Sequence, residues 1–241
     1  TLRGESAHAS VSWTGVNASY RLSRALNAIE EYQPELDTSL EIFDHLGSFG
    51  IEEKPSPTNI DHLVTEINET SPRLGSLLRA LSRLVLTPTM ISGGIKSNSV
   101  PEEIMLTCDI RTLPFQDETY VRRQLDQAFD GIEGLEYEID YMSVPNSSDF
   151  ETELTESIRN AQRAAIGRDD IQWIPAISNG FTDSRFTRDL GIITYGFTGS
   201  HPDDDPMLAR AHGTDESVGI ASLISGTRSM LALAYDLCGA K

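Results

Sequence analysis

Two short apolar segments, residues 171–177 and 192–197, constrain the fold of this 241-residue chain more than any other feature. Both segments are rich in β-branched and aromatic residues, and between them lie a polar turn and a predicted helix of about two turns, residues 183–190. A strand, a turn, a helix and a second strand are typical of an α/β sheet, in which reactive side chains emerge at strand ends. We therefore expect the functional site between residues 178 and 216.

The predicted helix carries a candidate substrate-binding residue, Arg185, in its first turn. A cation beside the positive end of a helix dipole is disfavoured by about 0.3–1 kcal/mol, so helix propensity alone would not place it there. A bound carboxylate would make an arginine favourable at this position, because both the dipole and the guanidinium attract the carboxylate. The alternative is an ordinary solvated arginine, and the residue pattern leaves both open.

A candidate metal-ligating residue, His212, lies at a junction between a loop and a long predicted helix, residues 215–237. Thr214 can cap this helix, and the apolar spacing predicts one buried face, formed by Ile220, Leu223, Ile224, Leu231 and Ala234. A lone histidine is more often packed or exposed than bound to a metal, so position alone does not assign its role.

The elements expected before residue 143 follow the order strand, helix, strand, strand, helix, strand. The strands are predicted at 2–9, 87–95, 103–113 and 135–142, the helices at 17–32 and 118–129, and a helical insertion at about 34–84. This order is the split βαβ, or ferredoxin-like, arrangement, an α/β fold with a four-stranded antiparallel sheet and two helices on one face.

A stretch rich in proline, asparagine and serine, residues 143–149, predicts a linker. It divides the chain into a first domain, 1–147, and a second domain, 148–241, which opens with a predicted helix at 150–166. The second domain is small, with two predicted strands, so it would expose sheet edges and apolar faces.

Four motifs carry a resemblance to a known family. They are Gly4-Glu-Ser-Ala-His-Ala-Ser10, then Gly93-Gly-Ile-Lys-Ser-Asn-Ser-Val-Pro101 followed by residues 108–114, then Gly180-Phe-Thr-Asp-Ser-Arg185, and finally His212-Gly-Thr-Asp-Glu216. In this order they resemble the dinuclear zinc peptidases and amidohydrolases (M20-like peptidases), which include aminoacylase, acetylornithine deacetylase, succinyl-diaminopimelate desuccinylase and glutamate carboxypeptidase.

The resemblance implies a lid, or dimerisation, domain with the split βαβ fold, followed by the C-terminal part of an α/β zinc-peptidase catalytic domain. It also implies that the catalytic domain is incomplete, because the family's N-terminal half supplies most metal ligands and the general base. No counterpart of that half is visible in the sequence.

The resemblance also implies roles for individual residues. His212 would bind one of two zinc ions, and His8 would reach into a neighbouring subunit's site and donate a hydrogen bond to the oxyanion intermediate. Asn98 and Arg185 would hold the substrate's carboxylate or carbonyl. The alternatives are an exposed histidine at a strand end for His8 and a hairpin turn for Asn98.

The charge and composition exclude several classes of partner. A net charge of −18 argues against nucleic acid and anionic membranes, and no stretch of the sequence is apolar for long enough to span a membrane. The two cysteines, Cys108 and Cys238, do not form a disulfide framework, so we expect a reducing, cytoplasmic location.

The expected function is zinc-dependent hydrolysis of the amide bond of an N-acyl amino acid or small peptide with a free carboxylate, by metal-activated water, in a homodimer formed through the lid. Because one histidine does not hold two zinc ions, we expect this chain alone to bind zinc weakly or not at all and to be inactive. The alternative is a non-catalytic dimerisation or binding module derived from the same family.

Overall fold

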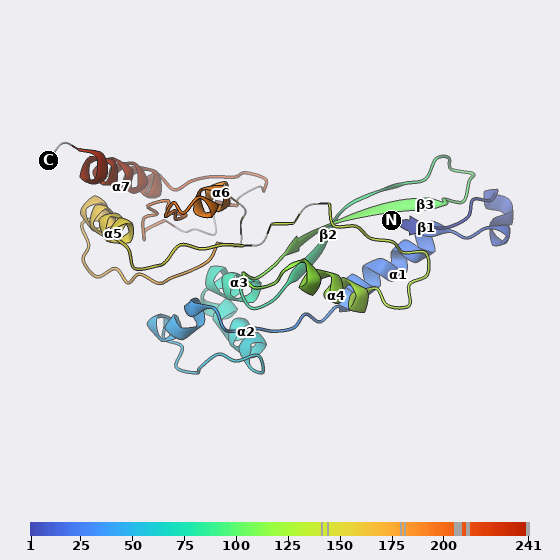
Figure 1. Cartoon of the computed structure of the whole chain (residues 1–241), viewed down its shortest axis with the longest axis horizontal. Coiled ribbons are helices and arrows are strands. Elements are labelled where there is room, and N and C mark those ends of the chain that lie inside the picture. Colours follow the sequence, from blue (N-terminus) through green and yellow to red (C-terminus); the bar gives the residue numbers. More distant parts are fainter. Residues whose placement is uncertain are drawn as a thin grey trace. The chain divides into compact units, whose positions relative to one another are not determined.

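The computed structural model describes residues 1–140, 142–143, 145–178, 180, 182–204, 209–210 and 213–239. The chain forms two compact units, and Figure 1 labels their helices and strands. The first unit comprises Thr1–Asp37 and Ser82–Pro145, and the second comprises Thr38–Leu81 and Asn146–Lys241. Residues 38–81, which the sequence presents as an insertion, thus belong to the second unit.

The described residues of the first unit form a three-stranded antiparallel sheet in the order β1-β3-β2. Its strands are β1 (Leu2–Arg3), β2 (Val85–Gly93) and β3 (Glu103–Arg111), and β2 and β3 form a hairpin with a bulge between Pro88 and Met90. Strand β2 is therefore an edge of the sheet.

Two helices, α1 (Ala18–Glu31) and α4 (Glu118–Ala128), cover one face of this sheet. Side chains alternate along β3, so Ile104 and Ile110 point to the covered face while Met105 and Thr107 lie on the exposed one. Each helix begins where a side chain accepts a backbone hydrogen bond, from Ser19 to Asn17 for α1 and from Tyr120 to Asp117 for α4.

The four-stranded sheet predicted for the lid is not confirmed. The predicted strand 2–9 is reduced to β1, because the chain turns back after Gly4 and Glu5 pairs with Val16 instead. The predicted strand 135–142 contributes one isolated bridge, between Leu135 and Leu2, among its described residues. A two-residue β1 offers so few backbone partners that a neighbouring strand cannot extend along it.

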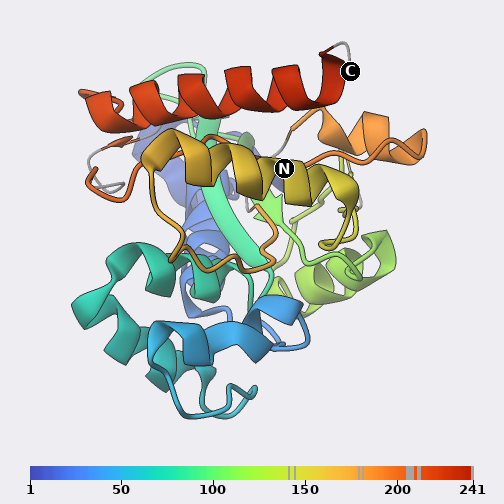
Figure 2. The ribbon, with the colours of Figure 1, turned by 90° about the vertical axis from the view of Figure 1, so that its left-hand side faces the viewer.

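The second unit is helical in its described residues. Its elements include the 3₁₀ segment η2 (Glu41–Phe49) and the helices α2 (Ile60–Thr70), α3 (Pro72–Ala80), α5 (Glu153–Ile166), α6 (Ser184–Asp189) and α7 (Ile220–Cys238). Helix α2 packs on α3, and Figure 2 shows α5 and α7 side by side. Helix α5 begins with a capping box between Thr152 and Thr155 and ends at Gly167 in the left-handed region.

The strands predicted at 171–177 and 192–197 are wrong, since the structure assigns no strand to either segment. The composition of both segments favours β-structure, but a strand also requires a hydrogen-bonded neighbour. The described part of the second unit contains no strand with which they could pair. The chain is still an α/β protein, with its sheet in the first unit.

The buried face predicted for α7 is also wrong. Its buried residues are the small Ser225, Gly226 and Ser229, which face α5 and the loop before α7, where Ser229 Oγ donates to Gln162 Oε1 at 2.6 Å. The apolar residues predicted to be buried point away from this contact, and Ile220 and Leu231 are 77% and 71% exposed. Small side chains allow the close approach to α5, so the apolar face is directed outward.

No helix within the described ranges is both long enough and apolar enough to cross a bilayer.

Candidate functional site

Two of the residues proposed from the sequence, His8 and Asn98, lie on neighbouring segments of the first unit that pair through backbone hydrogen bonds. The backbone of residues 7–9 pairs with that of residues 98–100, with an isolated bridge between His8 and Ser99. The Ala9 N–H donates to the Asn98 carbonyl at 2.9 Å, and the Val100 N–H donates to the Ala7 carbonyl at 2.8 Å. This register sets His8 opposite Ser99 and Asn98 opposite Ala9, so the two segments are neighbours although the His8 and Asn98 side chains belong to alternate positions of the ladder.

The imidazole of His8 is oriented by the turn that follows it. His8 is the N-cap of the 3₁₀ segment η1 (Ala9–Thr14), and its Nδ1 accepts the Ser10 N–H at 3.3 Å and lies 2.8 Å from Ser10 Oγ. A neutral ring that accepts at Nδ1 carries its proton on Nε2. The donor of the His8 ring in this form is therefore Nε2–H, and the side chain is exposed to solvent.

Asn98 lies in the turn that joins β2 to β3. The Ser99 N–H donates to the Lys96 carbonyl at 3.2 Å, and Gly94 has a φ of +77°, a conformation that a glycine adopts without strain. The Asn98 side chain is exposed.

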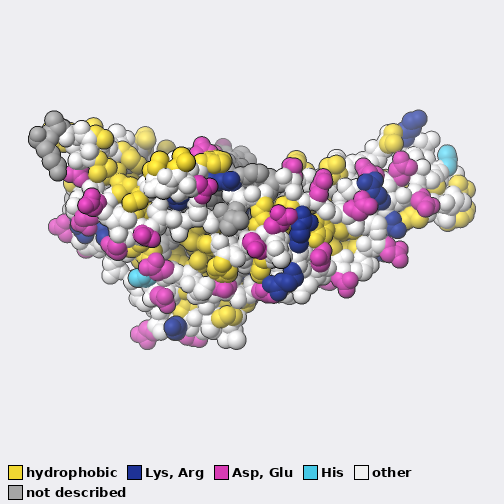
Figure 3. All heavy atoms as spheres, in the orientation of Figure 1, with side chains coloured by type: hydrophobic (Ala, Val, Ile, Leu, Met, Phe, Trp, Pro, Cys, Tyr) yellow, Lys and Arg dark blue, Asp and Glu magenta, His cyan; other side chains and the backbone are white. Residues whose placement is uncertain are grey.

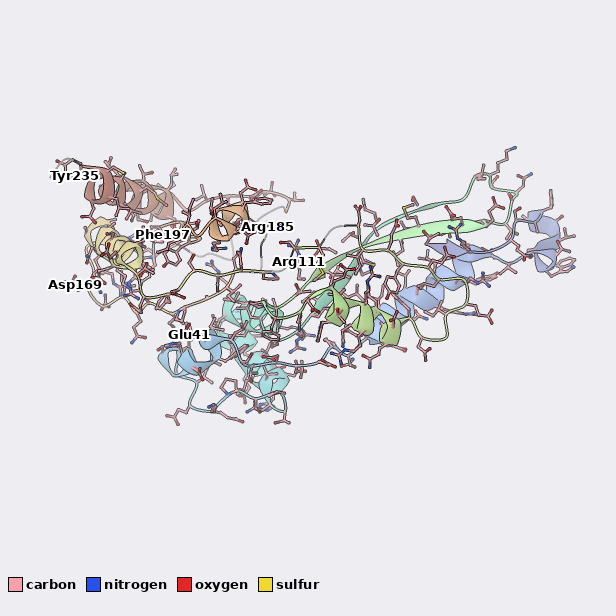
Figure 4. The ribbon with its side chains drawn as sticks, viewed as in Figure 1. Glu41, Arg111, Asp169, Arg185, Phe197 and Tyr235 are labelled. Atoms are coloured by element: carbon pink, nitrogen blue, oxygen red, sulfur yellow. The ribbon has the colours of Figure 1, made fainter. Side chains whose placement is uncertain are left out.

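Arg185 is on α6, close to the predicted helix 183–190. Figure 4 labels its side chain. The guanidinium carbon lies 4.5 Å from the centre of the Phe186 ring, a cation–π contact. At six residues α6 is too short to act as an anion site through its dipole, so the sequence-based dipole argument does not hold. Any attraction for a carboxylate rests on the guanidinium.

The segment that was predicted as a linker packs against α6. The Asn146 side chain donates from Nδ2 to the Arg185 carbonyl at 3.0 Å and to Asp189 Oδ1 at 2.8 Å. Arg188 donates to the Thr194 carbonyl from Nε at 3.1 Å and from Nη2 at 2.8 Å. Sequence reasoning missed Asn146 and Arg188. The spacing of Arg188 three residues after Arg185 was the one available signal, and it is a weak one.

His212, the predicted metal ligand, lies outside the described residues. Residues on either side of it are joined to one another, because the Ser217 N–H donates to the Ala209 carbonyl at 3.0 Å and the Gly213 N–H donates to the Arg210 carbonyl at 2.7 Å. Arg210 and Asp215 both have positive φ values, of 47° and 60°.

Across the described ranges no three histidine, cysteine, aspartate or glutamate side chains are grouped in a way that could hold a metal ion. We derive no catalytic step through a metal. The segments that carry His8 and Asn98 belong to the first unit, whereas Arg185 belongs to the second unit.

The chain resembles known proteins over nearly its whole length. A family model described as the peptidase dimerisation domain (M20) matches residues 1–133. Two curated relatives, probable succinyl-diaminopimelate desuccinylases of Staphylococcus aureus strains MRSA252 and Mu50, are each 25% identical to it over 229 and 227 residues. The matches cover 90% of this chain and 49% and 50% of the relatives, so the chain spans about half the length of the curated relatives it matches.

A solved structure shows the same fold. The M20 family metallo-carboxypeptidase Sso-CP2 of Sulfolobus solfataricus superposes with a TM-score of 0.58, at 17% identity, over 97% of this chain and 56% of that chain.

Proposed function

Because the chain belongs to the M20 peptidase dimerisation-domain family, we propose that it forms part of a metal-dependent hydrolase. The proposed reaction is cleavage of the amide bond of an N-acyl amino acid or a small peptide that carries a free carboxylate. The names of its relatives agree with this class, since a desuccinylase removes an acyl group from an amino acid and a carboxypeptidase releases a C-terminal residue.

The observation that carries this proposal is the exposed ring of His8, whose Nδ1 accepts the Ser10 N–H at 3.3 Å. The contact of Nδ1 with Ser10 leaves Nε2–H as the ring's donor, which is the group needed to bind a carbonyl oxygen that becomes negative during hydrolysis. One well-aimed donor of this kind contributes about 2.7–4 kcal/mol to transition-state stabilisation. Asn98, on the segment that pairs with residues 7–9, is proposed to offer its amide N–H₂ to the carboxylate or carbonyl of the substrate.

Arg185 is proposed to bind the free carboxylate of the substrate. A guanidinium forms two parallel hydrogen bonds with a carboxylate, which fixes both the position and the direction of a small substrate. The stacking of Arg185 on Phe186 holds part of the side chain in place before the substrate arrives.

A second copy of the chain is the proposed partner, bound through the first unit. Strand β2 is a sheet edge whose residues from Thr87 to Gly93 are all exposed, and Met90 and Ile91 are 64% and 57% exposed. Exposed, apolar edges tend to pair with another strand. In the resulting dimer, His8 is proposed to serve the site of the other subunit.

His212 is the residue of this chain proposed to hold a zinc ion, as neutral imidazole. When bound, such a metal supplies a water that ionises near neutral pH. The other ligands and the general base are proposed to come from the part of the protein outside these 241 residues, so the chain alone is expected to be inactive.

The test uses the full-length protein that contains this chain, assayed with N-acetyl and N-succinyl amino acids and dipeptides after loading with zinc. Replacing His8 with alanine is expected to lower kcat by about 10²–10³-fold. Replacing Arg185 with methionine is expected to lower kcat/KM by about 30-fold for substrates with a free carboxylate and to have little effect on their C-terminal amides, because hydrogen bonds to a charged group contribute about 2 kcal/mol.

Mixing the two inactive variants tests the dimer as well. If His8 acts in the neighbouring subunit's site, heterodimers of His8→Ala and Arg185→Met contain one complete site and restore about a quarter of wild-type activity. His62→Ala, at an exposed position on α2, is the matched control and should stay active. Zinc-loaded wild-type protein that hydrolyses none of these substrates would instead favour the non-catalytic module.

A further inference from the structure

The helix that carries Arg185 cannot be stable by itself. Helix α6 has six residues, all of them described, and none of them is buried. An isolated helix shorter than about 12–15 residues is marginal in water, and α6 lacks the buried apolar face that stabilises most short helices in proteins. Contacts from elsewhere must hold it.

Those contacts come from Asn146. Its Nδ2 donates to the Arg185 carbonyl at 3.0 Å and to Asp189 Oδ1 at 2.8 Å, so a single amide is bonded to the first and the last turn of α6. Its Oδ1 and carbonyl oxygens accept from Arg188 Nη1 at 3.4 and 3.5 Å. The Asn146 side chain therefore fixes the backbone of Arg185 directly.

Arg188 continues the network on the same helix. Its Nε and Nη2 both donate to the Thr194 carbonyl, and the Thr194 N–H donates to Ser148 Oγ at 3.0 Å. Thr187 and Thr194 hydroxyls lie 2.8 Å apart. We call Asn146, Ser148, Arg188 and Thr194 the α6 clamp, because a chain of hydrogen bonds through them joins α6 to the segments before α5 and after α6.

We propose that Asn146 and Arg188 are positioning residues that hold α6 and thereby aim Arg185 at a substrate carboxylate. Neither side chain is proposed to touch the substrate. This inference rests on the role proposed above for Arg185. It assigns a function to the segment 146–149, which the sequence presents only as a linker.

The first arm of the test measures amide hydrogen exchange over residues 186–191 in the wild type and in Asn146→Ala, Asn146→Asp and Arg188→Met. The aspartate variant keeps the size of the side chain and removes both N–H donations. Each variant is expected to exchange about ten-fold faster in α6 and at an unchanged rate in α5, because losing a hydrogen-bond partner typically costs about 1–2 kcal/mol locally. Ser147→Ala, at the exposed neighbouring position, is the matched control.

The second arm measures kinetics of the full-length enzyme. For a substrate with a free carboxylate, KM is expected to rise about ten-fold in Asn146→Asp, with kcat within two-fold of wild type and with the C-terminal amide of that substrate unaffected. For the same substrate, Arg188→Lys should raise KM less than Arg188→Met does. Equal losses with the carboxylate and the amide, or an unchanged KM, would overturn the positioning role.

The two arms separate this inference from the proposed function. If the wild-type protein hydrolyses neither N-acyl amino acids nor dipeptides, the proposed function fails and hydrogen exchange alone decides the clamp. Faster exchange in α6 then supports it, and exchange that matches Ser147→Ala overturns it.

Discussion

Two tyrosines in the first unit show how burial sets the chemistry of single residues. Tyr32 follows α1 and its hydroxyl donates to Gln124 Oε1 at 2.6 Å, while Tyr120 lies on α4 beside the ion pair of Arg123 and Glu35. Burial is the main cause that raises the pKa of Tyr32 to about 12 and the pKa of Tyr120 to about 12. Neither phenol is expected to ionise in the folded protein near neutral pH.

This raised pKa predicts an alkaline limit to stability. Because the pKa of each phenol is higher in the folded chain than its ordinary value of about 10, the neutral phenols stabilise the fold fully below about pH 10, and this contribution is lost as pH rises towards about 12. Ultraviolet absorbance of tyrosinate, followed together with circular dichroism, should show two phenols that ionise only as the fold is lost.

Replacing Tyr32 with phenylalanine should remove one of these steps and lower the free energy of unfolding by about 1 kcal/mol, since the buried Gln124 loses its donor. Tyr235→Phe, at a residue that is 79% exposed on α7, should leave stability unchanged. Ionisation of both buried phenols near pH 10 in the folded state would contradict the assignment.

At the scale of elements, the N-terminus of α7 is capped by a residue outside the helix. Gly219, its N-cap, has no side chain to accept a hydrogen bond, and the Asp204 carboxylate accepts the Ser222 N–H in its place. Ser222 Oγ in turn accepts the His201 N–H at 2.9 Å. A hydrogen bond with the Ser222 side chain is the main cause that lowers the pKa of Asp204, and the bond from the Ser222 N–H is the second.

Gly219→Ala is expected to destabilise the protein, because the new Cβ would lie 2.0 Å from the Asp204 carboxylate and would displace the cap. Overpacking of this kind costs about 1–3 kcal/mol. Asp204→Ala removes the same cap, so the double variant should be less destabilised than the sum of the two single variants in thermal unfolding. Gly196→Ala is the matched control, since its added Cβ meets no atom within 4 Å.

The capping by Asp204 also predicts that the stability of the fold decreases at acidic pH. Since the pKa of Asp204 is lower in the folded chain than in the unfolded one, its stabilisation is complete above the ordinary pKa of about 4 and is lost as pH falls through the folded value. In Asp204→Ala this part of the pH dependence of unfolding should disappear. Identical acid profiles for the variant and the wild type would contradict the capping role.

At the scale of the whole molecule, the outward face of α7 leaves large apolar side chains of the second unit exposed. Figure 3 shows hydrophobic side chains gathered along α7, and Ile220, Leu223, Leu231 and Tyr235 are all more than half exposed. Large apolar side chains gathered on an exposed helix often mark a surface that contacts another one. Because the chain spans about half the length of its curated relatives, we expect the remaining half to cover it.

Replacing Leu231 with glutamate tests this expectation in two contexts. In the 241-residue chain the change should alter the free energy of unfolding by less than about 0.5 kcal/mol and should reduce binding of an apolar dye. In the full-length protein the same change should destabilise the fold by about 2–5 kcal/mol, because it places a charge in a buried contact. Asn160→Glu, on the exposed surface of α5, should be neutral in both. Equal, small effects in both proteins would show that the face stays exposed.

The helices were the most predictable part of the fold, because their hydrogen bonds and caps lie within one segment. The apolar spacing and the caps placed α1, α4, α5 and α6 within a few residues of their observed bounds. In the candidate site, the motifs named His8, Asn98 and Arg185 before any geometry was known, and the role of each stays a prediction.

The amino-acid sequence by itself determined where the helices form and which side chains are candidates for binding, since both depend on residues close together in the chain. Only the tertiary structure decided the length of β1, the absence of strands in the described residues of 171–177 and 192–197, the outward face of α7 and the hydrogen bonds of Asn146 to α6. These features depend on partners tens of residues away, because a strand needs a neighbouring strand and a helix face is buried only where another surface meets it.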